Sequence, residues 1–378
     1  MIETYLDNSA TTRVCPPAAQ KMMELLTEAY GNPSSLHSKG LAAEREIQSA
    51  REILAQQLSC QPEELIFTSG GTEANNLALL GAANAKKRMG KRIIVSAVEH
   101  SSVLDTAREL EKQGFDVVYL QPDIYGKVPR EAIFEAITPD TILISLQMVN
   151  NEMGAIQPVE AVASALKRAK SSALFHVDAV QAFGKIPVKP HKLGIHLLTV
   201  TAHKIHGPKG VGALFLSKGT RILPRTFGGE QEKKIRPGTE NAAGICGFGA
   251  AIQALPDLTE AYAKVQSLRD RCVAGLQNLE GVVLNSAPDA LPYIVNFSVV
   301  GIRSETMLHF LSAEGIYVSS GSACAKGHKS HVLVASRLPE ERISSALRVS
   351  FCHENTEEEV DRFLSVLKQG ISTLVRAK

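Results

Sequence analysis

The sequence predicts an α/β fold, in which a large domain with a mostly parallel sheet is joined to a smaller α+β domain. Short apolar, β-branched runs alternate with helical stretches through the middle of the chain, which is typical of a parallel sheet with helices on both faces. The alternation stops after Leu255-Pro256-Asp257. Because 378 residues exceed what one ordinary core requires, a second domain is also expected from length.

Each element of the large domain is predicted from its local pattern. The strands are expected at Leu65–Thr68, Arg92–Ser96, Asp116–Leu120, Thr141–Val149, Ala173–Val177, His196–Thr201 and Gly212–Leu216. The helices between them are expected at Glu73–Lys87, Ser101–Gln113 and Val159–Lys170.

The C-terminal part follows a different pattern. A long helix is expected at Leu258–Leu279, followed by strands at Tyr293–Val299, Tyr317–Ser319 and Ala346–Phe351. A final helix is expected after the cap-like Asn355-Thr356, because three glutamates follow it. We therefore place the large domain at residues 15–255 and the small domain at residues 1–14 and 256–378.

Composition excludes several classes of protein. A hydrophobic content of 44% and a charged content of 21% are those of a globular protein. The net charge of +2 gives no electrostatic reason to expect nucleic acid or a membrane as a partner. The N-terminus lacks the basic and apolar regions of a signal peptide. Six cysteines without a CxxC pair indicate reduced thiols, and hence a cytoplasmic protein.

Three junctions between a strand and a loop carry polar residues that suit one site. In "IFTSGGTEANN" a glycine turn opens a helix, which suits a phosphate but is also an ordinary cap. In "FHVDAVQ" a strand ends at Asp178, which alone is more often a helix cap. In "TAHKIHGPKG" Lys204 is either a solvated loop residue or an amine able to form a Schiff base. Together they are the parts of a pyridoxal phosphate (PLP) site.

At this point the chain resembles a known family over nearly its whole length. The matching stretches are, in the family's order, "YLDNSATT", "GNPSSLH", "FTSGGTEANNLA", "VEHSSVLDT", "VNNEMGAIQP", "HVDAVQAFGK", "TAHKIHGPKGVG", "GGEQEKKIRPGTEN", "NFSVVG", "SSGSACAKG" and "LRVSF". They identify a cysteine desulfurase of the NifS/IscS type, in the class V aminotransferases. This resemblance implies the fold of a fold-type I PLP-dependent transferase with a mixed sheet.

The resemblance implies a cofactor role for a defined set of residues. Lys204 would hold PLP covalently, Asp178 would pair with its pyridine nitrogen, and His100 would stack on the ring and carry protons. The phosphate would be bound by Gly71, Thr72, Thr201 and His203, with Thr239 reaching the phosphate of the neighbouring subunit. Gln181 and Asn151 would bind near the phenolic oxygen. Each has an ordinary structural alternative, such as a core histidine, and only their joint occurrence favours the functional one.

The resemblance also implies the substrate, the reaction and the partners. Arg348, with Asn151, would bind the carboxylate of L-cysteine. Cys324 would take the sulfur as a persulfide and release L-alanine. The partners would be a second copy of the chain and a sulfur acceptor, either an iron–sulfur scaffold protein or a tRNA-thiolation enzyme.

The remaining thiols and histidines are expected to have no such role. Cys15, Cys60, Cys246, Cys272 and Cys352 are interpreted as buried or incidental residues. No metal is assigned to Cys324, His328 and His331, because their spacing matches no common zinc module. The loop after Cys324 is shorter than in the family's housekeeping members, which leaves the choice of acceptor open.

Three alternatives remain open from the sequence. A selenocysteine lyase would share nearly every residue named, and another class V aminotransferase would not need Cys324. A non-catalytic sulfur-carrier scaffold is disfavoured by the complete set of Lys204, Asp178, His100 and Arg348.

Overall fold

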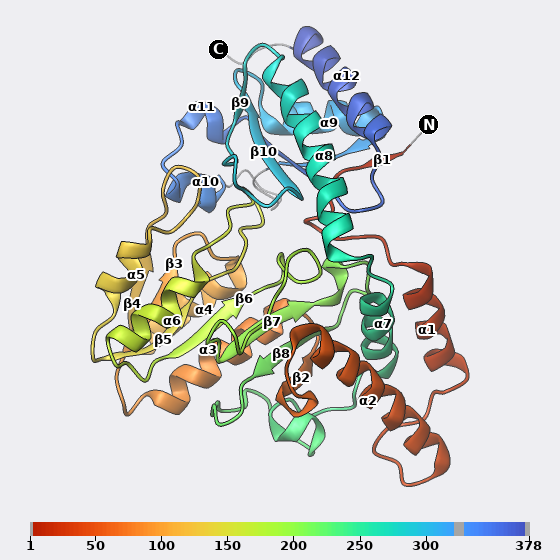
Figure 1. Ribbon diagram of the computed structural model, residues 1–378, viewed down its shortest axis with the longest axis vertical. Helices are drawn as coiled ribbons and strands as arrows, with labels where there is room; N and C mark the ends of the chain where they lie inside the picture. Colours follow the sequence, from red (N-terminus) through yellow and green to blue (C-terminus); the bar gives the residue numbers. More distant parts are fainter. Residues whose placement is uncertain (1–2, 321–328, 375–378) are drawn as a thin grey trace.

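A seven-stranded sheet forms the larger part of the molecule (Figure 1). The computed structural model describes residues 3–320 and 329–374. The strands are β2 (Leu65–Thr68), β3 (Arg92–Ser96), β4 (Asp116–Leu120), β5 (Thr141–Ser145), β6 (Leu174–Asp178), β7 (Leu197–Thr201) and β8 (Gly212–Leu216), in the order β2-β8-β7-β6-β5-β3-β4. Within this sheet β8 pairs antiparallel with β2 and β7, and all the other strand pairs are parallel. The predicted mostly parallel, mixed sheet is confirmed.

Apolar side chains alternate between the two faces of this sheet. Ile93 and Val95 pack in one cluster with α3 (Gly71–Lys86) and α4 (Ser101–Lys112), whereas Ile94 belongs to the cluster on the opposite face. Successive residues of a strand point to opposite faces, so both faces are apolar and need helices. The helices α5 (Arg130–Ala136) and α6 (Val159–Arg168) contribute to the second cluster.

Three helices that the sequence interpretation did not predict form one group, in which the last of them packs against the other two. They are α1 (Pro16–Thr27), α2 (Ser38–Leu58) and α7 (Ala242–Gln253). A Cβ at Gly247 would lie 2.6 Å from Cγ of Met22, and one at Gly249 would lie 2.9 Å from Cβ of Ala50. The glycines of α7 therefore allow α1 and α2 to approach its backbone.

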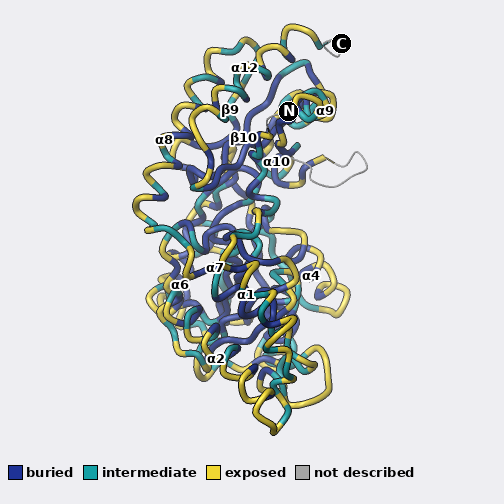
Figure 2. The backbone as a smooth tube through the Cα atoms, turned by 90° about the vertical axis from the view of Figure 1, so that its right-hand side faces the viewer, coloured by how far each residue is buried: buried dark blue, intermediate teal, exposed yellow. Residues whose placement is uncertain are grey.

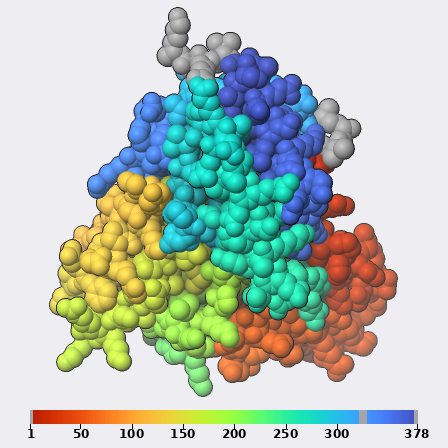
Figure 3. Space-filling view, turned by 45° about the horizontal axis from the view of Figure 1, so that its top comes forward, coloured from red at the N-terminus to blue at the C-terminus, as the bar shows by residue number. Residues whose placement is uncertain are grey.

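A second, antiparallel sheet lies above the first and is built from the C-terminal part of the chain (Figure 1). Its order is β12-β13-β10-β9, from β9 (Val282–Leu284), β10 (Ile294–Val299), β12 (Ser319–Ser320) and β13 (Ala346–Ser350). It packs against α8 (Leu258–Gln277), α9 (Ser304–Ala313) and α12 (Glu357–Thr373), while α10 (His331–Ala335) and α11 (Glu340–Ile343) border it. Figure 3 shows α8 alongside α12 on the surface. As predicted, α12 starts at a capping box, formed by Thr356 and Glu359.

The N-terminal segment crosses between the two sheets. The strand β1 (Thr4–Tyr5) pairs in parallel with β11 (Ile316–Tyr317), so the start of the chain lies among C-terminal elements (Figure 1). From there the segment reaches the loop after β7, where the Thr12 backbone N–H donates to the carbonyl of His203 at 2.9 Å. Buried backbone runs through both parts of the molecule (Figure 2). Among the described residues, no helix is both long and apolar enough to cross a bilayer.

Two expected strands differ from the structure. The strand predicted at Thr141–Val149 ends at Ser145, because the chain beyond it turns back, with Val149 bridging to Ile156. The strand predicted at Tyr317–Ser319 is divided between β11 and β12, which pair with different partners, β1 and β13.

Candidate active site

A cavity of ≈ 340 Å³ lies where the carboxyl ends of the large sheet face β13. Its lining includes every predicted site residue except Thr239 and Cys324, namely Gly71, Thr72, His100, Asn151, Asp178, Gln181, Thr201, His203, Lys204 and Arg348. Thr239 is exposed and lies outside this cavity. Cys324 lies outside the described residues. The carboxyl ends of parallel strands meet at one edge, which is why residues distant in sequence converge here.

Asp178 is the last residue of β6 and is held by two hydrogen bonds. Asn75 Nδ2 donates to its Oδ2 at 2.7 Å, and the backbone N–H of Val180 donates to its Oδ1 at 3.0 Å. Asn75 also donates to Ser102 Oγ at 2.9 Å. The sequence interpretation missed Asn75, although a polar residue on the buried face of an Ala- and Leu-rich helix is a signal for a site. These contacts fix the carboxylate within the cavity.

Lys204 lies in the short 3₁₀ turn Ala202–Lys204 that follows β7. Its Nζ donates to the carbonyls of Ser9 and Ala10, at 2.5 and 2.6 Å. Burial, together with the nearby positive charges of Lys185 and Arg348, lowers the pKa of Lys204 to about 7. A substantial fraction of this amine is therefore neutral near pH 7, as a nucleophilic lysine requires.

His100 and His203 line the cavity in different states of burial. His100 caps α4, and its Nδ1 accepts from the Ser102 backbone N–H at 3.1 Å, so in the neutral ring Nε2 carries the proton. His203 Nδ1 lies 3.3 Å from Thr11 Oγ1. Burial, followed by the charges of Lys204 and Lys209, lowers the pKa of His203 to about 4. His203 is therefore neutral at pH 7.

The start of α3 offers backbone donors to the cavity. Gly71 and Thr72 line the cavity in the first turn of this helix, whose positive dipole end favours an anion. A Cβ at Gly71 would lie 3.0 Å from Cγ2 of Val180, so glycine keeps this wall open. The Thr201 hydroxyl donates at 3.0 Å to the carbonyl of Val211, a residue that does not line the cavity.

Arg348 projects from β13 toward the large sheet and is 2% exposed. Its Nη1 donates to the carbonyl of Asn151 at 2.9 Å, and its Nη2 pairs with Asp7 Oδ1 at 2.8 Å. Its buried Nε has no partner among the described residues. Asp7 belongs to "YLDNSATT", but nothing in its local pattern indicated a partnership with an arginine 341 residues away.

The side-chain amide of Gln181 makes two hydrogen bonds that the sequence could not reveal. Its Nε2 donates to the carbonyl of Ser9 at 2.9 Å, and its Oε1 accepts from Lys185 Nζ at 3.1 Å. Lys185 is buried, and this burial lowers its pKa to about 8. The amide of Gln181 thereby connects the N-terminal segment, which also contacts Lys204, to the buried amine of Lys185.

The residues next to the undescribed segment 321–328 are anchored near the cavity. Ser319 of β12 is the register partner of Arg348, so the strand that leads to this segment runs beside the cavity wall. On the other side, Ser330 Oγ donates to buried Glu152 at 2.5 Å, and His331 Nε2 donates to the carbonyl of Glu99 at 2.9 Å. The chain before this segment is therefore paired with the strand of Arg348, and the chain after it is tied to Glu152 and Glu99, the neighbours of Asn151 and His100.

This fold and this cavity define a class V aminotransferase, and the comparison with known proteins agrees. The chain matches the family model "Aminotransferase class-V" over residues 4–363 and belongs to that family, whose members are in general PLP enzymes. It is 43% identical to "Cysteine desulfurase IscS" of Methanosarcina thermophila over 98% of this chain and 92% of that protein. The resemblance noted in the sequence is confirmed.

Solved structures give the same assignment. A structure titled "NIFS-LIKE PROTEIN" superposes with a TM-score of 0.94 at 39% identity, over 99% of this chain and 100% of that one. A second, "SspA in complex with cysteine", superposes with a TM-score of 0.83 at 32% identity, over 93% of this chain and 100% of that one.

Proposed function

We propose that the chain is a PLP-dependent cysteine desulfurase that converts L-cysteine to L-alanine and transfers the sulfur to Cys324. The observation that carries the proposal is the convergence of a half-buried lysine of lowered pKa, a fixed carboxylate and a buried arginine around one cavity. The names of the relatives support the substrate, since one is a cysteine desulfurase and another was solved with cysteine.

The residues present fit the cofactor. Lys204 supplies an amine for covalent attachment, Asp178 a carboxylate for the pyridine nitrogen, and the start of α3 backbone donors for the phosphate. Buried polar atoms without partners among the described residues, Ser9 Oγ and Asn75 Oδ1, belong to residues that line the same cavity. When bound, PLP supplies an electron sink that weakens the bonds at the substrate's α and β carbons.

The protein's own residues then bind, orient and move protons. Arg348 binds the substrate carboxylate through the edge that includes its unpartnered Nε, while Asp7 and the Asn151 carbonyl keep the guanidinium oriented. The Lys204 amine would take the α proton of the substrate, and His100 Nε2 would serve as a second proton carrier. In the net reaction the substrate C–S bond breaks, a sulfur–sulfur bond forms on Cys324, and the β carbon gains a proton, so that two thiols yield alanine and a persulfide.

The test is to incubate the purified holoenzyme with L-cysteine and to measure alanine and sulfide, with L-selenocysteine in parallel. We expect alanine from L-cysteine, and no alanine from a Cys324→Ser variant. Turnover of selenocysteine alone would indicate a selenocysteine lyase. Full turnover by Cys324→Ser would favour an aminotransferase, and a colourless protein without turnover would indicate a scaffold.

We also propose a two-domain organisation and a homodimer. The large domain comprises residues 15–255, and the small domain comprises residues 1–14 and 256–378. Large apolar side chains are exposed on the α1 side of the molecule and in the loop before Thr239, including Met23, Leu26, Tyr30, Leu36 and Phe227. Such exposure favours a protein partner, and a second copy would bring Thr239 to the neighbouring cofactor. Sulfur acceptors remain an iron–sulfur scaffold protein or a tRNA-thiolation enzyme.

A further inference from the structure

Lys185 is a buried amine to which the proposed reaction assigns no role. Its side chain is 6% exposed. In the described part of the chain, its Nζ has one hydrogen-bond acceptor, Gln181 Oε1 at 3.1 Å, and no carboxylate within ion-pair distance. The ring centroid of Tyr293 lies 5.6 Å from Nζ. Burying a charge without a counter-ion costs stability, and an apolar side chain would fill the same space at a lower cost. Lys185 therefore points to a role other than stability.

The two partners of the Gln181 amide leave it one favourable orientation. Burial lowers the pKa of Lys185 to about 8, so most of this amine is still charged at pH 7 and can only donate. The Ser9 carbonyl can only accept. Oε1 therefore faces Lys185, and Nε2 faces Ser9 at 2.9 Å. Turning the amide by half a turn would place N–H groups against the ammonium and one carbonyl oxygen against another.

The donor end of this amide lies on the side of the candidate active-site cavity. Ser9 and Gln181 line that cavity, whereas Lys185 does not. One N–H of Nε2 is used by the Ser9 carbonyl, and the other has no acceptor among the described residues. The amide can therefore offer a hydrogen-bond donor to a molecule in the cavity.

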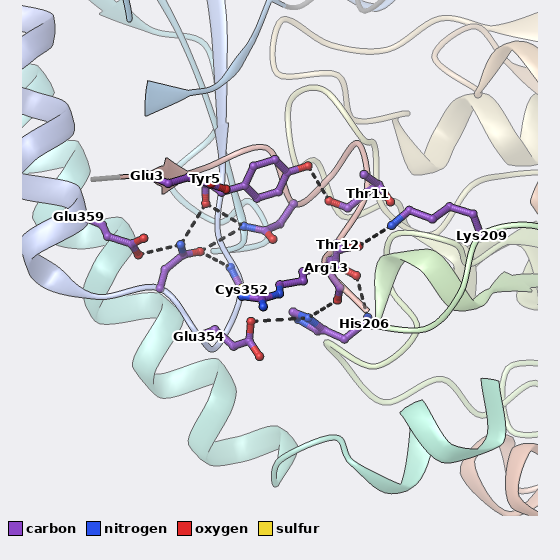
Figure 4. A pocket seen from close by; sticks show the side chains of 12 residues that line it. Glu3, Tyr5, Thr11, Thr12, Arg13, His206, Lys209, Cys352, Glu354 and Glu359 are labelled. Atoms are coloured by element: carbon purple, nitrogen blue, oxygen red, sulfur yellow. Dashed lines mark hydrogen bonds and ion pairs between the residues drawn. The ribbon is translucent and has the colours of Figure 1, made fainter. Parts of the chain in front are cut away.

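The N-terminal segment that carries the Ser9 carbonyl is fixed from its other side (Figure 4). A second pocket, of ≈ 500 Å³, borders the segment there, and Thr12 and Lys209 line it. Figure 4 shows Lys209 reaching the segment, where its Nζ donates to the Thr12 carbonyl at 3.0 Å. The Ser9 backbone N–H donates to Ser350 Oγ of β13 at 2.8 Å. Ser9 is thus a fixed acceptor, and Lys185 supplies the second contact that the amide needs.

We propose that Lys185 is a positioning residue that holds the Gln181 amide with its N–H donor toward the cofactor. This role rests on the proposed PLP site, in which the family resemblance places Gln181 near the phenolic oxygen. A donor at that place favours the ionised phenolic oxygen, which only accepts hydrogen bonds, over the neutral phenol. The positive charge of Lys185 behind the amide acts in the same direction.

The test compares the binding of PLP with that of its 3-deoxy analogue, which lacks the phenolic oxygen. Both are titrated at pH 7, by equilibrium dialysis, into the cofactor-free full chain carrying Lys204→Ala. This background keeps binding non-covalent and removes the amine whose pKa Lys185 also lowers. The ratio of the two dissociation constants, analogue over PLP, measures what the phenolic oxygen contributes to binding.

We expect Lys185→Met to lower this ratio by about tenfold, because methionine fills the volume but leaves the amide free to turn. Gln181→Met should lower the ratio as well, and adding Lys185→Met to it should change the ratio no further. The matched control is Lys209→Met, which removes a lysine that donates to the same segment but does not contact Gln181. Its ratio should equal that of the Lys204→Ala background.

Three results would overturn the proposal. Equal weakening of both ligands by Lys185→Met would show a merely structural role, and a further fall in the Gln181→Met background would show a charge that acts without the amide. A ratio that falls as far in Lys209→Met would exclude a specific contact. A protein with its lysine intact that fails to bind PLP would overturn the proposed function as well. A ratio that depends on Lys185 in a protein that makes no alanine from L-cysteine would support the positioning role and contradict only the proposed reaction.

Discussion

The lowered pKa of Lys204 leads to a quantitative prediction for the cofactor-free protein. Its folded-state pKa of about 7 lies well below the ordinary value of 10.5. This difference corresponds to about 5 kcal/mol against the charged amine, at 1.36 kcal/mol per pKa unit. At pH 7.5 about three-quarters of Lys204 side chains are then neutral, against about one in a thousand for an ordinary lysine.

The assay is labelling of cofactor-free protein with trinitrobenzenesulfonate between pH 5.5 and 10, with the Lys204 peptide quantified by mass spectrometry. The reagent attacks only neutral amines, so the rate should rise with pH and reach half its maximum near pH 7.

A variant tests the cause of the shift. Lys185→Met conserves volume and removes the largest repulsive charge on Lys204, so the midpoint should move to higher pH. Lys192→Met, the same substitution at an exposed site, should leave the midpoint in place. A midpoint above pH 9 in the parent protein, or one that does not rise in Lys185→Met, would refute the reasoning.

Four further predictions follow from the site. Burial raises the pKa of Glu152 to about 7, so this carboxyl stabilises the fold below pH 4.5 and loses that contribution as pH rises through 7. Relative to the parent, Glu152→Gln should therefore gain about 3 kcal/mol between pH 4.5 and 8 in denaturant unfolding, and a pH-independent difference would contradict this. Asn75→Ala removes a charge-assisted hydrogen bond to Asp178 and should raise the dissociation constant for PLP by about tenfold or more, measured by dialysis and visible absorption. Thr239→Val should weaken cofactor retention by about 1.5–3 kcal/mol in a dimer, whereas a fully active monomer would exclude the shared site. Iodoacetamide should modify Cys324 faster at neutral pH than Cys60, Cys246, Cys272 and Cys352, whose pKa values burial raises to about 11–12, and activity should fall in step. Faster reaction of any of these four would contradict that assignment.

The sequence alone determined the parts of the molecule that depend on local pattern. The strands of the large sheet alternate with helices, and each strand end carries its own polar residue, so Asp178 and Lys204 could be recognised without coordinates. Their convergence was predictable as well, because parallel strands present their carboxyl ends at one edge. The helices α1, α2 and α7 were missed. The small residues of α7 are explained only by the close approach of the two helices that pack against it, and this approach is visible only in the folded structure.

Only the tertiary structure decided which distant groups meet. Asp7 pairs with Arg348 and the Ser9 carbonyl holds Lys204 because β1 joins β11 and carries the N-terminal segment between the two sheets. The lowered pKa of Lys204 depends on burial and on charges that the fold brings near it. The short stretch of sequence around Lys204 does not reveal either of these causes. The contact between His206 Nδ1 and the Glu354 carboxylate, 3.9 Å apart, has the same origin, because one residue follows β7 and the other follows β13.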